Sequence, residues 1–166
     1  MRKFLKNLAN NLFSKPAEPK ETVEIEEEAE KDPGFHGLGI APKLLEILDR
    51  LKFTVPTPIQ HQAIELATAG KDVVGIAQTG TGKTIAFAIP VIQQLALTRG
   101  KGLILVPTRE LAIQVNEVFK QFSPILNIHS AVLIGGENIE PQIRELRRGP
   151  RIIAATPGRL LDHIGQ

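Results

Sequence analysis

The spacing of hydrophobic residues becomes helical near residue 35. In "APKLLEILDRL", one face of a helix would carry Leu44, Leu45, Leu48 and Leu51, and a second helical pattern follows in "TPIQHQAIELATAG". Pro42 occupies a position that favours a helix start, and Gly70 one that favours a helix end. We therefore expect two short helices in this region.

Beyond Gly70, short apolar runs alternate with longer helical patterns. The runs are "DVVGIA", "GLILVP", "HSAVLIG" and "RIIAAT", and the patterns after them are "GKTIAFAIPVIQQLAL", "TRELAIQVNEVFKQF", "NIEPQIRELRRG" and "PGRLLDHIGQ". This alternation is typical of βαβ units, in which helices cover both faces of a parallel sheet. We predict an α/β fold with four parallel strands and right-handed crossovers. Pro90, inside the first helical pattern, predicts a kink or an early break.

The first 34 residues have a different character. Their start carries apolar residues at helical spacing beside basic ones, at Phe4, Leu5, Leu8 and Leu12. A membrane-surface or partner-binding helix is one interpretation, and a frayed tail is the favoured one, because short isolated helices are marginal in water. The stretch that follows is rich in Glu, Lys and Pro and poor in apolar residues. We predict a disordered leader over residues 1–34, whose partner, if any, is unknown, and a folded part over residues 35–166.

Composition narrows the possible functions. The chain has no cysteine, which excludes disulfides and thiolate metal sites, and its four histidines lack metal-ligand spacing. No apolar run approaches the roughly 20 residues of a membrane span, and the start does not resemble a secretory signal. We therefore expect a cytoplasmic protein. Residues 1–34 carry a net charge of −2 and the remainder +4, so the folded part suits a polyanionic partner.

The stretch "GIAQTGTGKT" lies between a predicted strand and a predicted helix. Glycines there would let backbone N–H groups converge on phosphate oxygens, and the helix start would add partial positive charge. Lys83 would reach the β- and γ-phosphates, and the Thr84 hydroxyl would hold Mg²⁺. The usual pattern begins with glycine, whereas this chain has Ala77. We predict that a nucleoside triphosphate is bound by Ala77, Gln78, Thr79, Gly80, Thr81, Gly82, Lys83 and Thr84; the alternative is a glycine-rich turn with an incidental lysine.

Five stretches together resemble a known family. "FHGLGIAPKLLEILDRLKFTVPTPIQ", "AQTGTGKT", "PTREL", "GG" and "TPGR" are similar, in this order, to motifs of the first RecA-like lobe of DEAD-box ATP-dependent RNA helicases. The resemblance spans residues 35–166 and implies a RecA-like P-loop NTPase lobe. It also places the family's adenine-reading Q motif at about residues 33–61.

The resemblance implies that Gln60 selects ATP and that Phe53 stacks on adenine. A glutamine amide can both accept from and donate to the N6/N7 edge of adenine, whereas guanine presents two acceptors there. Lys52 is a departure, because the family often has glycine before the aromatic residue. The alternative for these positions is a glutamine on a helix surface and a phenylalanine in the core.

The same resemblance implies an RNA-binding edge. Three predicted loops follow strands, so they would meet at the carboxyl edge of the sheet, where helix N-termini and basic side chains suit a sugar-phosphate backbone. No aromatic residues line these loops, so sequence-specific base reading is not expected. The implied RNA contacts are Pro107, Thr108, Arg109, Gly135, Gly136, Thr156, Gly158 and Arg159. The alternative is ordinary strand-end turns and helix caps.

The pattern lacks one element of a nucleotide hydrolase. No apolar run ends in the Asp or Glu that would hold Mg²⁺ through water. In the family, the "DEAD" sequence and the second lobe follow "TPGR". We therefore expect an incomplete lobe of a monomeric RNA helicase that remodels short duplexes, with Lys83 and Thr84 as catalytic residues and little hydrolysis by this part alone. A truncated, non-hydrolysing nucleotide- and RNA-binding module is the alternative. "PTPIQ", "PTREL" and "TPGR" argue against a small kinase or a DNA helicase.

Overall fold

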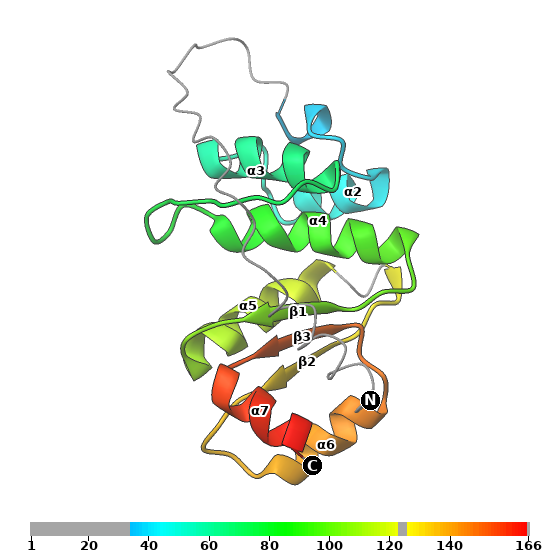
Figure 1. Ribbon diagram of the computed structural model, residues 1–166. Coiled ribbons are helices and arrows are strands. Elements are labelled where there is room, and N and C mark those ends of the chain that lie inside the picture. The colour runs from blue at the N-terminus through cyan, green and yellow to red at the C-terminus, as the bar shows by residue number, and fades with distance from the viewer. Residues whose placement is uncertain (1–33, 123–125, 166) are drawn as a thin grey trace.

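The computed structural model describes residues 34–122 and 126–165 (Figure 1). The predicted leader therefore lies outside the described residues, apart from Gly34. In chain order the elements are η1 (Gly34–Gly37), α2 (Pro42–Arg50), α3 (Pro58–Thr68), α4 (Lys83–Leu97), β1 (Gly102–Leu105), α5 (Arg109–Phe122), β2 (Ser130–Leu133), α6 (Ile139–Arg147), β3 (Ile152–Ala155) and α7 (Pro157–Gly165).

The strands form a parallel sheet in the order β1-β3-β2. Ile152 of the central strand pairs with Gly102 on one side and with Ser130 on the other. All four residues of β3 are buried, as expected for a strand with a neighbour on each side and helices above and below. The α/β class and the parallel sheet predicted from the sequence are confirmed.

Helices cover both faces of the sheet (Figure 1). One face packs against α5 and, beyond it, α2 to α4, in a core that includes Phe119, Ile89 and Ile152. The other face packs against α6 and α7 through a smaller core that includes Leu146, Ile153 and Leu160. Alternate residues of β3 thus enter different cores, which follows from the two-residue repeat of a strand.

The expected first strand, "DVVGIA", is absent. Residues 71–78 form no ladder with any described strand, and the side chains of Val74 and Ile76 are both 92% exposed. This segment lies beside α3, where Gly75 approaches the side chain of Ile59. The prediction of four strands is therefore wrong for the described residues, which contain three. β-branched residues favour extended backbone, but a strand also needs a hydrogen-bonding neighbour, and none of the three described strands pairs with this run.

Helix α4 continues through Pro90, so of the two predicted outcomes the early break is wrong, whereas the kink stays a prediction. The helix buries Pro90 together with Ile89 and Ile92. Packing of this apolar face against its neighbours offsets the hydrogen bond that the proline ring removes.

Two helices end with the same backbone device. The amide of Lys71 bonds to the carbonyl of Leu66, and that of Gly70 to Ala67, while Gly70 has a φ of +77°. This is a Schellman ending, in which a left-handed residue reverses the chain. Helix α2 ends in the same way, with Phe53 bonded to Leu48, but its left-handed residue is Lys52, with a φ of +62°.

We expect Lys52→Gly to raise the free energy of unfolding by about 0.5–1 kcal/mol, because relief of a left-handed conformation outweighs the extra chain entropy of glycine. Urea unfolding of the 166-residue chain measures the change. Lys52→Ala is the matched control, since it removes the same charge and stem but keeps the Cβ. A gain that appeared equally in Lys52→Ala would assign the effect to the side chain instead of the backbone.

Candidate functional site

The glycine-rich loop leads directly into the first turn of α4. Gly80 and Gly82 both have a φ of +82°, in the left-handed region, and Gly82 is the N-cap of the helix. The first amides of a helix have no intrahelical acceptor, so this loop presents N–H groups at a positive helix end. A loop of this kind is suited to an anion.

Lys83 folds back over this loop. Its ammonium donates to the backbone carbonyls of Ala77 and Gln78, and the hydroxyl of Thr81 donates to Gln78 as well, over 2.7 Å. The positive charge is therefore held at the loop and not out in solvent. An anion in the loop would replace carbonyl oxygens as the partner of the ammonium group.

Gln60 supports the loop from the start of α3. Its Oε1 accepts from the amide of Thr57 at 3.0 Å, and its Nε2 donates to the carbonyl of Gly82 at 3.1 Å. The Thr57 hydroxyl donates to the carbonyl of Thr81 at 2.7 Å. The capping box of α3 thus also fixes the backbone at the start of α4.

Gln60 is only 3% exposed, so it is not a helix-surface glutamine. Each end of its amide makes one bond to the protein, which leaves one donor hydrogen and one acceptor lone pair by the usual count. Phe53 is partly buried against the main core. The predicted adenine contacts of Gln60 and Phe53 stay predictions.

Thr84 and Lys83 lie at the border of an apolar cleft of about 570 Å³. The cleft lies between α3, α4 and the edge strand β1, and includes Ile59, Phe87 and Ile104 among its lining residues. The described residues contain no cluster of three or more His, Cys, Asp or Glu side chains suited to a metal ion. Thr84, the one residue predicted to bind Mg²⁺ directly, stays a prediction.

The second group of predicted residues meets at one edge of the sheet. Leu105 and Leu133 both pair with Ala155, so the three strands end side by side, and the loops that follow them lie at the same edge. Each loop leads into a helix. The Thr108 hydroxyl accepts from the amide of Leu111 at the start of α5, and Asn138 caps α6 by accepting from Glu140 at 3.0 Å.

Arg109 joins the first of these loops to the second. A Cβ placed on Gly136 would lie 2.2 Å from Nη1 of Arg109, so the guanidinium occupies the space that a side chain would need. Gly136 also has a φ of +76°. Glycine is required here for two separate reasons, backbone conformation and the approach of the arginine.

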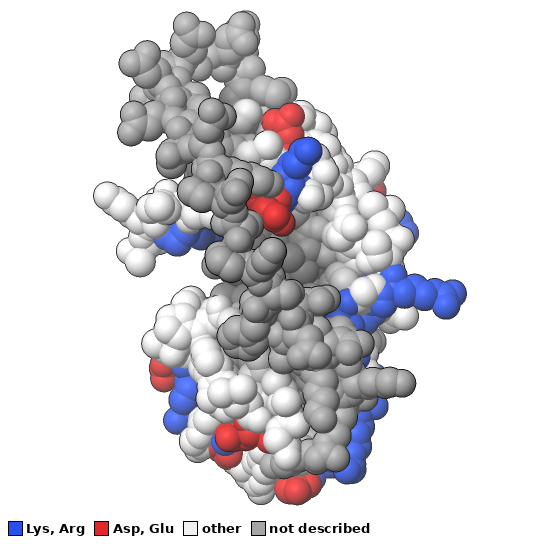
Figure 2. All heavy atoms as spheres, in the orientation of Figure 1, with Lys and Arg blue, Asp and Glu red and all other residues white. Residues whose placement is uncertain are grey.

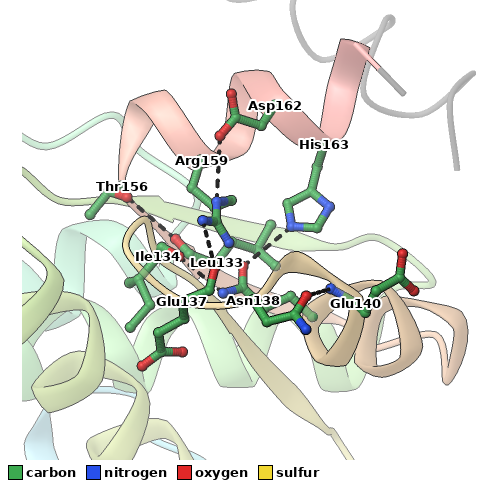
Figure 3. Close-up of polar contacts among 10 residues, drawn as sticks. Leu133, Ile134, Glu137, Asn138, Glu140, Thr156, Arg159, Asp162 and His163 are labelled. Atoms are coloured by element: carbon green, nitrogen blue, oxygen red, sulfur yellow. Dashed lines mark hydrogen bonds and ion pairs between the residues drawn. The ribbon is translucent and has the colours of Figure 1, made fainter.

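Arg159 lies among buried polar groups between α6 and α7 (Figure 3). It is only 9% exposed, its Nη2 donates to the carbonyl of Glu137 at 3.0 Å, and its Nε lies 3.4 Å from Oδ2 of Asp162. Nearby, Gln142 donates to the carbonyl of Ile134 at 3.0 Å, and its Oε1 lies 3.3 Å from Nε2 of His163.

Sequence reasoning missed Gln142, Asp162 and His163. Gln142 and His163 come from different helices, 21 residues apart, and no local pattern marks either of them. In the third loop, the amide of Thr156 donates to the carbonyl of Leu133 at 3.0 Å. This bond connects the third loop to the end of β2.

Burial lowers the pKa of His163 below its ordinary value of 6.5, and the positive charge of Arg159 lowers it further, whereas Asp162 acts in the opposite direction. The unfolded chain then binds more protons at His163 than the folded chain does once the pH falls to about 6.5 and below. Folding stability attributable to His163 is therefore present above this pH and decreases as the pH falls towards the lowered pKa.

We expect the free energy of unfolding to fall between about pH 7.5 and about pH 5.5, and to fall less in His163→Gln. Urea titrations across this range measure both slopes. His129→Gln is the control, because His129 is exposed at the opposite end of β2 from the cluster. Equal slopes in the parent chain and His163→Gln would contradict the assignment to His163.

The chain also matches a known protein family. Residues 57–166 match the family model described as DEAD/DEAH box helicase, which is more than half of the chain. The chain belongs to the DEAD/DEAH box helicase family. The matched region begins at Thr57, so it contains the capping box of α3, the glycine-rich loop and all three edge loops of this family member. The family resemblance predicted from the motifs is confirmed.

Curated relatives of this DEAD/DEAH box chain carry a consistent name. The ATP-dependent rRNA helicase RRP3 of Eremothecium gossypii is 47% identical over 149 residues, which cover 87% of this chain and 31% of the relative. The protein of the same name from Sclerotinia sclerotiorum is 44% identical over 184 residues, which cover 98% of this chain and 38% of the relative. The chain thus spans about a third of the length of these relatives.

A solved structure supports the predicted RecA-like α/β lobe. The RNA helicase Prp28 from Chaetomium thermophilum, in a crystal structure bound to ADP, matches with a TM-score of 0.73 and 38% sequence identity. The match covers 80% of this DEAD/DEAH box chain and 34% of the Prp28 chain. Within the described ranges, none of the helices has the length and apolar character of a bilayer crossing.

Proposed function

We propose that the chain binds ATP and RNA as part of the first lobe of an ATP-dependent RNA helicase that remodels short RNA duplexes. One observation carries this proposal: a glycine-rich loop at the positive end of α4 is held by Gln60, the residue that is also expected to recognise adenine. Gln60 would then both recognise the base and hold the backbone that binds the phosphates. Membership of the helicase family and the names of the relatives agree with it.

In this proposal the residues have separate roles. The amides of Gly80 to Thr84 hold the phosphates, Lys83 neutralises the terminal ones, and Gln60 and Phe53 contact adenine. Thr84 would hold Mg²⁺, an ion that keeps several waters and takes its other ligands from the phosphates, which fits a site with one protein hydroxyl. The bound metal would supply charge neutralisation on the phosphates.

RNA would lie along the carboxyl edge of the sheet. The residues proposed to face it are Pro107, Thr108, Arg109, Gly135, Gly136, Thr156 and Gly158. On the face drawn in Figure 2, Lys and Arg gather mainly on the right, whereas the strand ends point to the left in Figure 1. Backbone amides at helix starts, together with Arg109, would therefore supply most of the attraction at this edge, without base reading.

The nucleotide half is tested by selectivity. We expect Gln60→Ala to lower the preference for ATP over GTP by about 5- to 100-fold, because a bidentate amide contact to a base discriminates by about 1–3 kcal/mol. Competition titrations against a fluorescent ATP analogue give both affinities.

Thr57→Val is the matched control for Gln60→Ala. This variant removes the hydrogen bond from the Thr57 hydroxyl to Thr81 but leaves the Gln60 amide. We therefore expect it to lower the affinities for ATP and GTP without changing their ratio. If Gln60→Ala lowered the affinities for ATP and GTP equally, Gln60 would support the loop and would not recognise adenine. A nucleotide- and RNA-binding module without turnover is the second candidate, because no apolar run in the given sequence ends in the carboxylate that hydrolysis requires.

A further inference from the structure

The turn at residues 135–138, here called the GG turn, is contacted by two arginines that differ in exposure. Arg109 is exposed, and its guanidinium lies against Gly136. Arg159 is 9% exposed and donates to the carbonyl of Glu137. The sequence predicts both arginines as RNA contacts, but the structure gives them unlike surroundings.

The guanidinium of Arg159 has little surface to offer a phosphate. Its Nε and Nη1 are buried and have no hydrogen-bond partner among residues 34–122 and 126–165, and Nη2 donates to the carbonyl of Glu137. Its neighbour on the solvent side is Asp162, a carboxylate that would repel a phosphate. A buried guanidinium of this kind affects the site by holding neighbouring backbone groups in position.

Two side chains, Arg159 and Gln142, hold the backbone on either side of the two glycines. Gln142 donates to the carbonyl of Ile134, just before the glycines, and Arg159 donates to the carbonyl of Glu137, just after them. Both side chains connect to α7, since Arg159 belongs to it and Gln142 contacts His163 (Figure 3). The GG turn is therefore fastened to the helix that begins with the "TPGR" loop.

We propose that Arg159 is a positioning residue that fixes the GG turn to the start of α7 and makes no contact with RNA phosphate. The inference rests on the proposed RNA-binding function and specifies how its edge is built. Two backbone loops held as one rigid unit lose less entropy when a strand binds, so the loss of this support weakens binding without removing a phosphate contact.

Salt dependence separates the two roles. Each phosphate contact on a single strand contributes about 0.7 to the slope of log K against log salt concentration. For fluorescein-labelled oligouridine, followed by anisotropy in a series of KCl concentrations, we expect Arg159→Gln to weaken binding about tenfold with an unchanged slope. Arg109→Gln, the matched exposed arginine, is expected to lower the slope by about 0.7.

Arg159→Lys adds a test of geometry. It keeps the charge but loses the guanidinium that reaches Glu137, so we expect it to weaken binding about as much as Arg159→Gln does. The inference would be overturned if Arg159→Gln lowered the slope of log K against log salt concentration by about 0.7 and Arg159→Lys restored it. A residue that contacts a phosphate would behave in this way. Unchanged affinity in Arg159→Gln would overturn it too.

A measurement without RNA distinguishes failure of this inference from failure of the proposed function. Amide ¹⁵N order parameters of Gly135, Gly136 and Glu137 are expected to fall from about 0.85 to below about 0.6 in Arg159→Gln, while those of α4 stay unchanged and report a folded protein. If Arg159→Gln did not fold, Arg159→Lys would be measured in the same way. A parent chain that did not bind oligouridine would refute the RNA proposal, whereas a turn that stayed rigid in both variants would refute the positioning role even if RNA bound.

Discussion

Gly82→Ala is expected to lower the free energy of unfolding by about 2–5 kcal/mol. A residue other than glycine at a φ of +82° costs about 1–2 kcal/mol. The added Cβ would also lie 2.2 Å from Nε2 of Gln60, so the amide that supports the loop must move, at a further cost of about 1–3 kcal/mol. Urea unfolding monitored by circular dichroism measures the total.

Gly80→Ala separates the two contributions to this loss. Gly80 has the same φ of +82°, but a Cβ there would meet nothing within 4 Å. We expect a loss of only about 1–2 kcal/mol for this variant. The double variant Gly82→Ala/Gln60→Ala should be less destabilised than the sum of its single changes, because the clash no longer exists. Equal losses at both glycines would mean that contact between Gln60 and the loop adds nothing.

Lys83→Ala is expected to weaken ATP binding by about 10- to 100-fold, which corresponds to the 1.5–3 kcal/mol typical of hydrogen bonds to charged groups. In the structure the Lys83 ammonium already lies over the glycine-rich loop, held by the carbonyls of Ala77 and Gln78. Little reorganisation is needed to bring it to a bound phosphate. Isothermal titration calorimetry with ATP and Mg²⁺ gives the affinity directly.

Lys71→Ala is the control for this change, because Lys71 is an exposed lysine that precedes the same loop in the sequence. General loss of positive charge would affect both variants, whereas a contact with phosphate affects Lys83→Ala alone. Undiminished ATP affinity in Lys83→Ala would remove the basis for the proposed nucleotide site. A loss of affinity shared by ATP and inorganic triphosphate would support contact with the phosphates rather than with the base.

The two expected effects concern one structural unit. Thr57 and Gln60 bond to the carbonyls of Thr81 and Gly82, so the start of α3 and the start of α4 are fixed to each other at the loop. A ligand that changed the backbone of the loop would therefore also act on Gln60. If Gln60 contacts adenine as proposed, these bonds would connect the group that binds the base to the backbone that binds the phosphates.

Much of the fold was determined by the sequence itself. The alternation of apolar runs and helical patterns predicted the α/β class, because strand and helix periodicities depend on neighbouring residues. Gly70, Gly80 and Gly82 occupy left-handed positions, as a residue without a Cβ allows, and the motifs placed the three edge loops at strand ends. These features are local, so the sequence specifies them without knowledge of the remaining structure.

Tertiary structure decided what depends on distant partners. "DVVGIA" has the composition of a strand, but none of the described strands pairs with it, and Pro90 stays inside a helix because that helix is packed. Gln60 and Arg159 are both buried, and their partners Gly82 and Glu137 each lie 22 residues away in sequence. Pairing, burial and long-range hydrogen bonds arise only when separate segments meet, so composition and motifs named these residues, while the folded chain fixed what each one touches.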